Sequence, residues 1–146
     1  MAVKLRKNLG INALITAFKV HEAAIGGDSE GYTELNICAK NAGESSLKGI
    51  DFSDEKIVVP IKPLNDLLAQ APSDAQVVIK CDVEGYEYEV FAPLFEGTSL
   101  RFPDIILLEV EHKARWEFDL IEKLLHLGYK IEFEGEGNCL LIRHNL

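Results

Sequence analysis

The spacing of hydrophobic and polar residues changes along the chain and predicts a mixture of helices and strands. Residues 3–14 carry apolar side chains at helical spacing, with basic residues on the opposite face, which predicts an amphipathic helix. Pro63 begins a second stretch of helical spacing, as a proline in a first helical turn does. The first half is therefore predicted to contain helices at 3–14 and 63–71 and strands at 17–25, 32–39 and 56–62.

The second half shows a clearer alternation of apolar runs and helical spacing. The apolar runs are short, and a glycine follows each predicted helix, as is common at helix C-termini. The tetrapeptide Gly-Glu-Gly-Asn separates two final apolar runs and is typical of a hairpin turn. The predicted elements are strands at 76–83 and 104–111, helices at 84–96 and 115–127, and a closing hairpin of 129–134 with 139–144.

This order of elements predicts an α/β fold. A strand followed by a helix and another strand favours parallel pairing through a right-handed crossover. The closing hairpin adds an antiparallel strand, and Pro60 suggests that the strand 56–62 lies at an edge. We therefore expect a doubly wound, mostly parallel sheet with an antiparallel C-terminal hairpin, in which ligands bind beyond the C-terminal ends of the strands.

Length and composition narrow the class of protein. A chain of 146 residues suits a single domain, residues 1–146. Lys plus Arg number 15 and Asp plus Glu 24, so the net charge is 15 − 24 = −9, which disfavours nucleic acid and anionic membranes as partners. No apolar run reaches the length of a membrane span. Three scattered cysteines with no CxxC pair indicate a reduced, cytoplasmic protein and argue against a zinc site, and no residue is assigned as a metal ligand.

Acidic residues cluster at the predicted ends of two strands. Asp82 and Glu84 follow one buried strand, and Glu109, Glu111 and His112 end the next. Glu109 and Glu111 are two residues apart, so they are expected to share one face of the strand. Such carboxylates can bind a hydroxyl or amine, or hold a hard cation, and His112 can accept a proton.

Simpler interpretations of the same residues stay open. Asp82 or Glu84 can cap the N-terminus of the following helix. Glu87 and Glu89 are expected to face solvent, and His112 can be an ordinary loop residue.

Two loops are further candidates for binding. Ala24, Ile25 and Gly26 begin a small, flexible loop that suits a flat ligand such as adenine, or forms a plain turn. A polar loop that holds Asn41, Ser45 and Ser46 either covers a site or only connects strands. Neither the phosphate-binding pattern GxxxxGK nor the dinucleotide-binding pattern GxGxxG occurs in the sequence.

Several motifs occur in an order that resembles a known family. The segment VVIKCDVEGYEYEVF carries a lysine-x-aspartate-x-glutamate-glycine-x-glutamate signature, and DIILLEVEH resembles the strand that follows it. PLNDLL, AAIGGDSEGYTEL, NAGESSL and GYKIEFEGEGNCLLIRH resemble the surrounding pieces. Together they resemble the FkbM-type family of S-adenosylmethionine-dependent methyltransferases over nearly the whole chain.

The resemblance implies a function and a cofactor. It implies a Rossmann-like class I methyltransferase sheet that transfers a methyl group from S-adenosyl-L-methionine to a hydroxyl of a small molecule, sugar or lipid. By this resemblance Ala24, Ile25 and Gly26 lie on the adenine side. The acceptor side then holds the catalytic candidates Asp82, Glu84 and His112 and the substrate-binding candidates Ser45, Glu109 and Glu111. Asp82 either takes the hydroxyl proton or orients the cofactor's amino group.

The sequence departs from the family at its beginning. KLRKNLGIN resembles the helix after the family's second strand, so the chain resembles an N-terminally truncated domain that lacks two strands and the glycine-rich cofactor loop. A non-catalytic remnant or interaction module of the same fold is therefore the alternative, with a small acidic metal-binding domain as a third. An open edge beside the strand 76–83 would favour a homo-oligomer.

Overall fold

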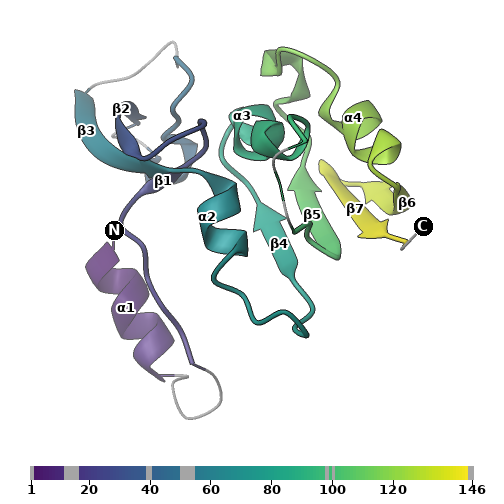
Figure 1. The fold of residues 1–146 in the computed structure, drawn as a ribbon. Helices are drawn as coiled ribbons and strands as arrows, with labels where there is room; N and C mark the ends of the chain where they lie inside the picture. Colours follow the sequence, from purple (N-terminus) through teal and green to yellow (C-terminus); the bar gives the residue numbers. More distant parts are fainter. Residues whose placement is uncertain are drawn as a thin grey trace.

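The chain folds into two β-sheets with short helices (Figure 1). The computed structural model describes residues 2–11, 17–38, 41–49, 55–97, 99 and 101–144. A three-stranded sheet comes from the first half of the chain, and a four-stranded sheet comes from the second half. The mixed α/β class is confirmed, whereas the single continuous sheet expected from the sequence is not observed.

The three-stranded sheet has the order β1-β3-β2, with β1 spanning Ala24–Ile25, β2 Gly31–Ile37 and β3 Glu55–Lys62. β3 pairs in parallel with β1 and antiparallel with β2. The edge position expected for β3 is therefore wrong, because β3 is the central strand. Pro60 is tolerated there because β1 pairs only with Ile61 and Lys62, so the ladder on that side requires no N–H from Pro60.

The helices of the first half are short. α1 spans Ala2–Ile11, so it begins one residue before the predicted helix 3–14, and residues 12–14 lie outside the described part of the chain. α2 spans Leu64–Leu68 and begins after Pro63, whose φ of −63° suits a helix start. A 3₁₀ turn, η1, spans Ala42–Glu44.

The four-stranded sheet has the order β4-β5-β7-β6. Its strands are β4 Val78–Cys81, β5 Ile105–Glu109, β6 Tyr129–Gly135 and β7 Asn138–Arg143. β4 and β5 are parallel, while β5–β7 and β6–β7 are antiparallel. The closing hairpin is thus confirmed, but the expectation of a mostly parallel sheet is wrong for the described strands. The crossover through α3 produces one parallel pair, β4–β5. The closing hairpin then contributes only antiparallel pairs.

Helices of the second half connect these strands. They are α3 Glu87–Phe91, η2 Ala92–Leu94, η3 Lys113–Arg115 and α4 Leu120–His126. Pro93 falls within η2, so the α-helical hydrogen bonding ends at Phe91 and continues as a 3₁₀ turn. Asp119 caps α4 by accepting a hydrogen bond from the N–H of Glu122, which explains why this helix begins later than predicted.

One hydrophobic core lies between the four-stranded sheet and the helices α2, α3 and α4. Leu124 of α4 is fully buried, as predicted, and Phe91, Ile106, Leu108 and Leu141 are also fully buried. The helical spacing of residues 115–127 predicts that Phe118, Ile121 and Leu125 face inward as well as Leu124. Phe118 is 53% exposed, because it precedes α4, which begins only at Leu120. Leu125 is 42% exposed, because the buried face of α4 is formed by Leu120 and Leu124.

The edge of β4 opposite β5 pairs with no strand in the described part of the chain. Val78 is 60% exposed at this edge. Among the described residues, no helix has the length and apolar character required to cross a membrane.

Candidate functional site

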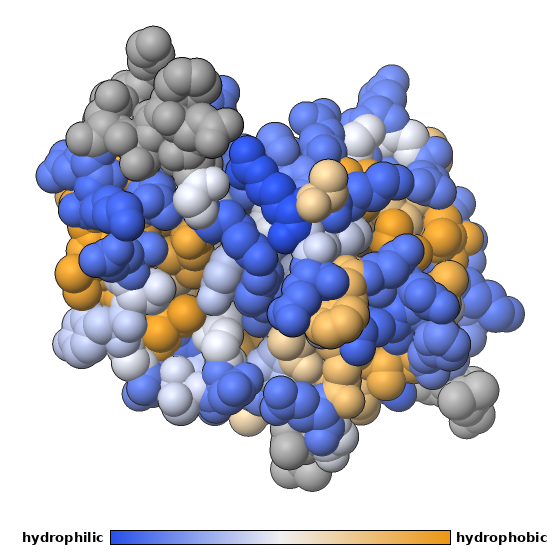
Figure 2. Space-filling view, turned by 90° about the horizontal axis from the view of Figure 1, so that it is seen from above, coloured by the Kyte–Doolittle hydropathy of each residue, from blue (hydrophilic) through white to orange (hydrophobic). Residues whose placement is uncertain are grey.

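β4 and β5 run parallel, so their C-terminal ends reach the same edge of the sheet. Asp82, Glu84 and Glu109 meet there, with one carboxylate oxygen of each lying within 4.8 Å of the others. Figure 2 looks down on the face toward which these strand ends point, and hydrophilic side chains cross its middle between apolar patches. The expected convergence of acidic residues from two strand tips is therefore observed.

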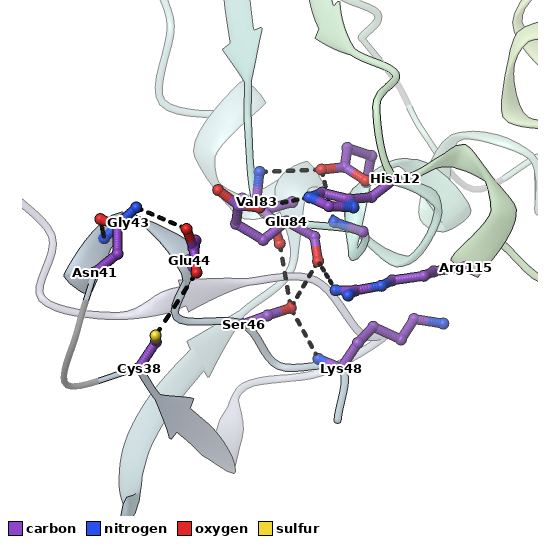
Figure 3. Close-up of polar contacts among 12 residues, drawn as sticks. Cys38, Asn41, Gly43, Glu44, Ser46, Lys48, Val83, Glu84, His112 and Arg115 are labelled. Atoms are coloured by element: carbon purple, nitrogen blue, oxygen red, sulfur yellow. Dashed lines mark hydrogen bonds and ion pairs between the residues drawn. The ribbon is translucent and has the colours of Figure 1, made fainter. Parts of the chain in front are cut away.

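Glu84 and His112 form a close pair at this edge (Figure 3). Nε2 of His112 lies 2.9 Å from Oε2 of Glu84. The Glu84 side chain is 17% exposed and that of His112 is 34% exposed, so both remain accessible to a small ligand. A carboxylate against one ring nitrogen favours the tautomer that carries a proton there, which leaves Nδ1 free to accept one.

Glu87 is buried, with only 1% exposure, although the sequence placed it in solvent. Its Oε1 accepts hydrogen bonds from the backbone N–H groups of Val83 and Gly85, both at 3.1 Å. Its Oε2 accepts one from Nε1 of Trp116 at 2.8 Å. No capping side chain is found at α3, so Asp82 and Glu84 do not cap it. Glu87 instead satisfies the N–H groups of the preceding loop.

Glu109 has the most perturbed carboxyl group of the site. Burial, and then the negative charges of Asp82, Glu84 and Glu87, raise the pKa of Glu109 to about 7. Its Oε2 is buried and has no hydrogen-bond partner in the described structure. Near neutral pH this group therefore exchanges a proton readily and can either donate or accept a hydrogen bond.

Asp82 and Glu111 differ in their relation to the cluster. Asp82 is exposed, and its Oδ2 pairs with Nζ of Lys80 at 2.7 Å. Glu111 does not share the face of Glu109, because β5 ends at Glu109 and the chain turns. Glu111 packs instead beside the hairpin, where a β-carbon on Gly137 would lie 2.5 Å from its Cγ.

The loop Ala24–Gly26 lies against the turn that follows β4. Gly26 is buried, and a β-carbon on it would lie 2.7 Å from Cε1 of Tyr86. Beside this loop an open groove of about 1030 Å³ follows the free edge of β4. Its lining is mostly apolar and includes Ile25 and Asp82, so two of the residues expected to contact the cofactor border one cavity. The β1 loop is thus brought beside the signature segment.

Of the two neighbouring serines, Ser46 rather than Ser45 contacts the signature segment. Oγ of Ser45 accepts a hydrogen bond from the backbone N–H of Cys38 at 3.2 Å, within its own loop. Ser46 is 2% exposed, and its Oγ donates to the carbonyl oxygen of Glu84 at 2.9 Å.

Sequence reasoning missed Glu87, Arg115 and Trp116 as parts of this site, and it named Ser46 only within a loop that either covers a site or connects strands. Glu87 could have been found, because an acidic residue in the first turn of a helix that follows a glycine commonly binds free N–H groups. Ser46, Arg115 and Trp116 carry no such local signal, since only tertiary packing brings them to the strand tip.

The C-terminal tips of parallel strands are where α/β proteins bind their ligands, and these tips carry carboxylates and a histidine. A family model described as the methyltransferase FkbM domain matches residues 1–131 of the 146-residue chain. The protein belongs to the FkbM methyltransferase domain family. No curated protein and no solved structure matches this chain.

Proposed function

We propose that the protein is an S-adenosyl-L-methionine-dependent O-methyltransferase that acts on a hydroxyl of a small molecule, sugar or lipid. Membership of the FkbM domain family supports methyl transfer as the activity class. The parallel pair β4–β5, flanked by the antiparallel β7, supports a Rossmann-like origin of the four-stranded sheet. The observation that carries the proposal is the groove bordered by both Ile25 and Asp82, which leads to the acidic strand tips.

The residues of the groove fit the proposed cofactor. Ile25 contributes an apolar wall for an adenine ring, and Gly26, which does not line the groove itself, lets this loop pack closely against Tyr86. Asp82 offers a carboxylate to an amino or hydroxyl group at the end of the groove. The cofactor, when bound, supplies a methyl group already activated on a sulfonium.

The protein's own residues are then needed to orient the acceptor and to remove its proton. His112 is the proposed proton acceptor through Nδ1, while Glu84 holds its other ring nitrogen. Glu109 is proposed to bind the acceptor hydroxyl, since its pKa of about 7 allows it to donate or accept a hydrogen bond near neutral pH.

Calorimetric titration with S-adenosyl-L-methionine and S-adenosylhomocysteine tests this function. We expect binding in the micromolar range, about −8 kcal/mol. Asp82→Ala should weaken it at least tenfold, whereas Asp74→Ala, at another exposed aspartate, should leave it unchanged. No heat with the wild-type chain would reject cofactor binding by this chain and favour a non-catalytic member of the family.

A second candidate function is the binding of a divalent cation. The proximity of Asp82, Glu84 and Glu109, together with the unpartnered Oε2 of Glu109, favours it, because hard cations prefer carboxylate oxygens. Thermal unfolding with added Ca²⁺ or Mg²⁺ tests this candidate. A cation at 100 times its dissociation constant stabilises the native state by about 2.7 kcal/mol. An unchanged melting temperature, or equal shifts in the wild type and Glu109→Gln, would reject it.

A further inference from the structure

Glu84 has a backbone conformation that residues with a side chain seldom adopt. Its φ angle is 56°, in the left-handed region, and Gly85 follows with a φ of 94°. A strained residue of this kind persists only where its surroundings hold it in place, and such residues concentrate at functional sites. The contacts of Glu84 therefore show which residues hold its backbone in this conformation.

Two donors from separate parts of the chain hold the carbonyl oxygen of Glu84 (Figure 3). Oγ of Ser46 donates to it at 2.9 Å, and Nη1 of Arg115 donates to it at 3.2 Å. Ser46 comes from the loop between β2 and β3, whereas Arg115 comes from η3 after β5. The oxygen is thus held from both halves of the chain.

The backbone N–H groups of the two residues that flank Glu84 are also held. The N–H groups of Val83 and Gly85 both donate to Oε1 of the buried Glu87. With the carbonyl oxygen and both neighbouring N–H groups held, the carboxylate of Glu84 is directed toward His112, 2.9 Å away.

Ser46 can hold Glu84 because Ser46 is itself fixed on β2. Its backbone exchanges two hydrogen bonds with Asn36, at 2.9 and 3.1 Å. Nδ2 of Asn36 also donates to the carbonyl oxygens of Ser46 and Lys48, each at 3.1 Å. Asn36 is 6% exposed and Ser46 is 2% exposed. This arrangement ties the three-stranded sheet to the strand tip of the four-stranded sheet.

We propose that Ser46 is a positioning residue that keeps Glu84 in its left-handed conformation and its carboxylate against His112. The three-stranded sheet thereby sets the geometry of a site built on the other sheet. Only the use of His112 as proton acceptor rests on the proposed function; the positioning of Glu84 does not.

NMR spectroscopy of the wild type, Ser46→Ala and the matched control Ser45→Ala tests this inference. One readout is the sign of φ at residue 84, from the backbone scalar coupling and chemical shifts. The other is the hydrogen-bonded Nε2–H proton of His112, assigned with His112→Gln. We expect Ser46→Ala to lose the positive φ and the imidazole signal, and Ser45→Ala to retain both. Retention of both in Ser46→Ala would overturn the proposal.

A second variant covers the case in which Ser46→Ala does not fold. Ser46→Cys keeps the volume of the buried side chain but is a weak donor. We expect the same loss of both signals in this variant, and their retention would count equally against the proposal. Titration of the same proteins with S-adenosylhomocysteine distinguishes a failure of the proposed function from a failure of the Ser46 proposal. A wild type that gives no heat rejects the proposed function. The NMR readouts still decide the role of Ser46 in that case.

Discussion

Glu87 is a charged residue that the fold buries almost completely. Its two carboxylate oxygens accept three hydrogen bonds, from two backbone N–H groups and from the indole of Trp116. A buried carboxylate is tolerated when donors surround it in this way. Glu87 therefore connects the loop after β4 with the segment after β5, and its role is to shape the site rather than to contact a ligand.

Replacing Glu87 with glutamine should destabilise the protein. A glutamine has one acceptor oxygen, and its NH₂ group would face an N–H donor that now lacks a partner. We expect the free energy of unfolding to fall by about 1–3 kcal/mol in urea denaturation. Glu96→Gln, at an exposed position, is the control. Equal stability of the two variants would show that the Glu87 contacts contribute little.

Glu109 should make the stability of the protein depend on pH. Its pKa is raised from 4.5 to about 7 in the folded state, so between these values the folded protein binds more protons than the unfolded chain. The contribution of Glu109 to the free energy of unfolding is therefore full below pH 4.5, falls as pH rises, and is lost above pH 7.

Glu109→Gln removes this titrating group. We expect the free energy of unfolding of Glu109→Gln, relative to wild type, to rise between pH 4.5 and 7 and to stay constant above. Urea denaturation across this range measures the difference, with Glu96→Gln as control. A difference that does not change with pH would contradict a raised pKa of Glu109.

At the scale of elements, the two parallel strands β4 and β5 each end two residues earlier than their hydrophobic pattern predicts. β4 ends at Cys81, and the next residues leave the strand for a turn with two consecutive positive φ angles, at Glu84 and Gly85. Gly85 is required there for two reasons. Its φ is 94°, and a β-carbon would lie 2.6 Å from Cδ of Arg115, which covers the turn.

Gly85→Ala should therefore lower the free energy of unfolding more than the same substitution at another glycine with a positive φ. Gly97 also has a positive φ, 71°, but no heavy atom lies within 4 Å of its would-be β-carbon. Gly97→Ala thus measures backbone strain alone, about 1–3 kcal/mol. We expect Gly85→Ala to lose more than Gly97→Ala in chemical denaturation, because Arg115 must also move. Equal losses would mean that the Arg115 contact is easily relieved.

At the scale of the whole molecule, β4 is an edge strand with an apolar groove beside it. Unpaired backbone groups next to apolar side chains favour association with another chain. We propose that the protein self-associates through this edge when no cofactor is bound, since a second chain and the cofactor would occupy the same groove, with a homo-oligomer as the product.

Sedimentation at increasing protein concentration tests self-association. Val78→Lys places a charge at the 60% exposed edge position and should reduce the oligomer fraction. Tyr32→Lys is the control, since Tyr32 is 77% exposed on the other sheet. A wild type that stays monomeric at high concentration, or equal effects of both variants, would reject this surface.

The sequence by itself determined the α/β class, the order of elements in the second half and the meeting of Asp82, Glu84 and Glu109. These follow from local periodicity and from the rule that parallel strands end at a common edge. It also determined the family, through an ordered set of motifs that the family model matches over residues 1–131.

Only the tertiary structure decided the division into two sheets, the central position of β3, the burial of Glu87 and the contact of Ser46 with Glu84. Strand pairing and burial depend on residues far apart in the chain: Ser46 and Glu84 are separated by 38 positions. A local pattern reports the chemistry of a side chain but not its distant partners. For this reason the sequence can indicate that Glu87 binds free N–H groups, but it does not show that the fold buries this residue.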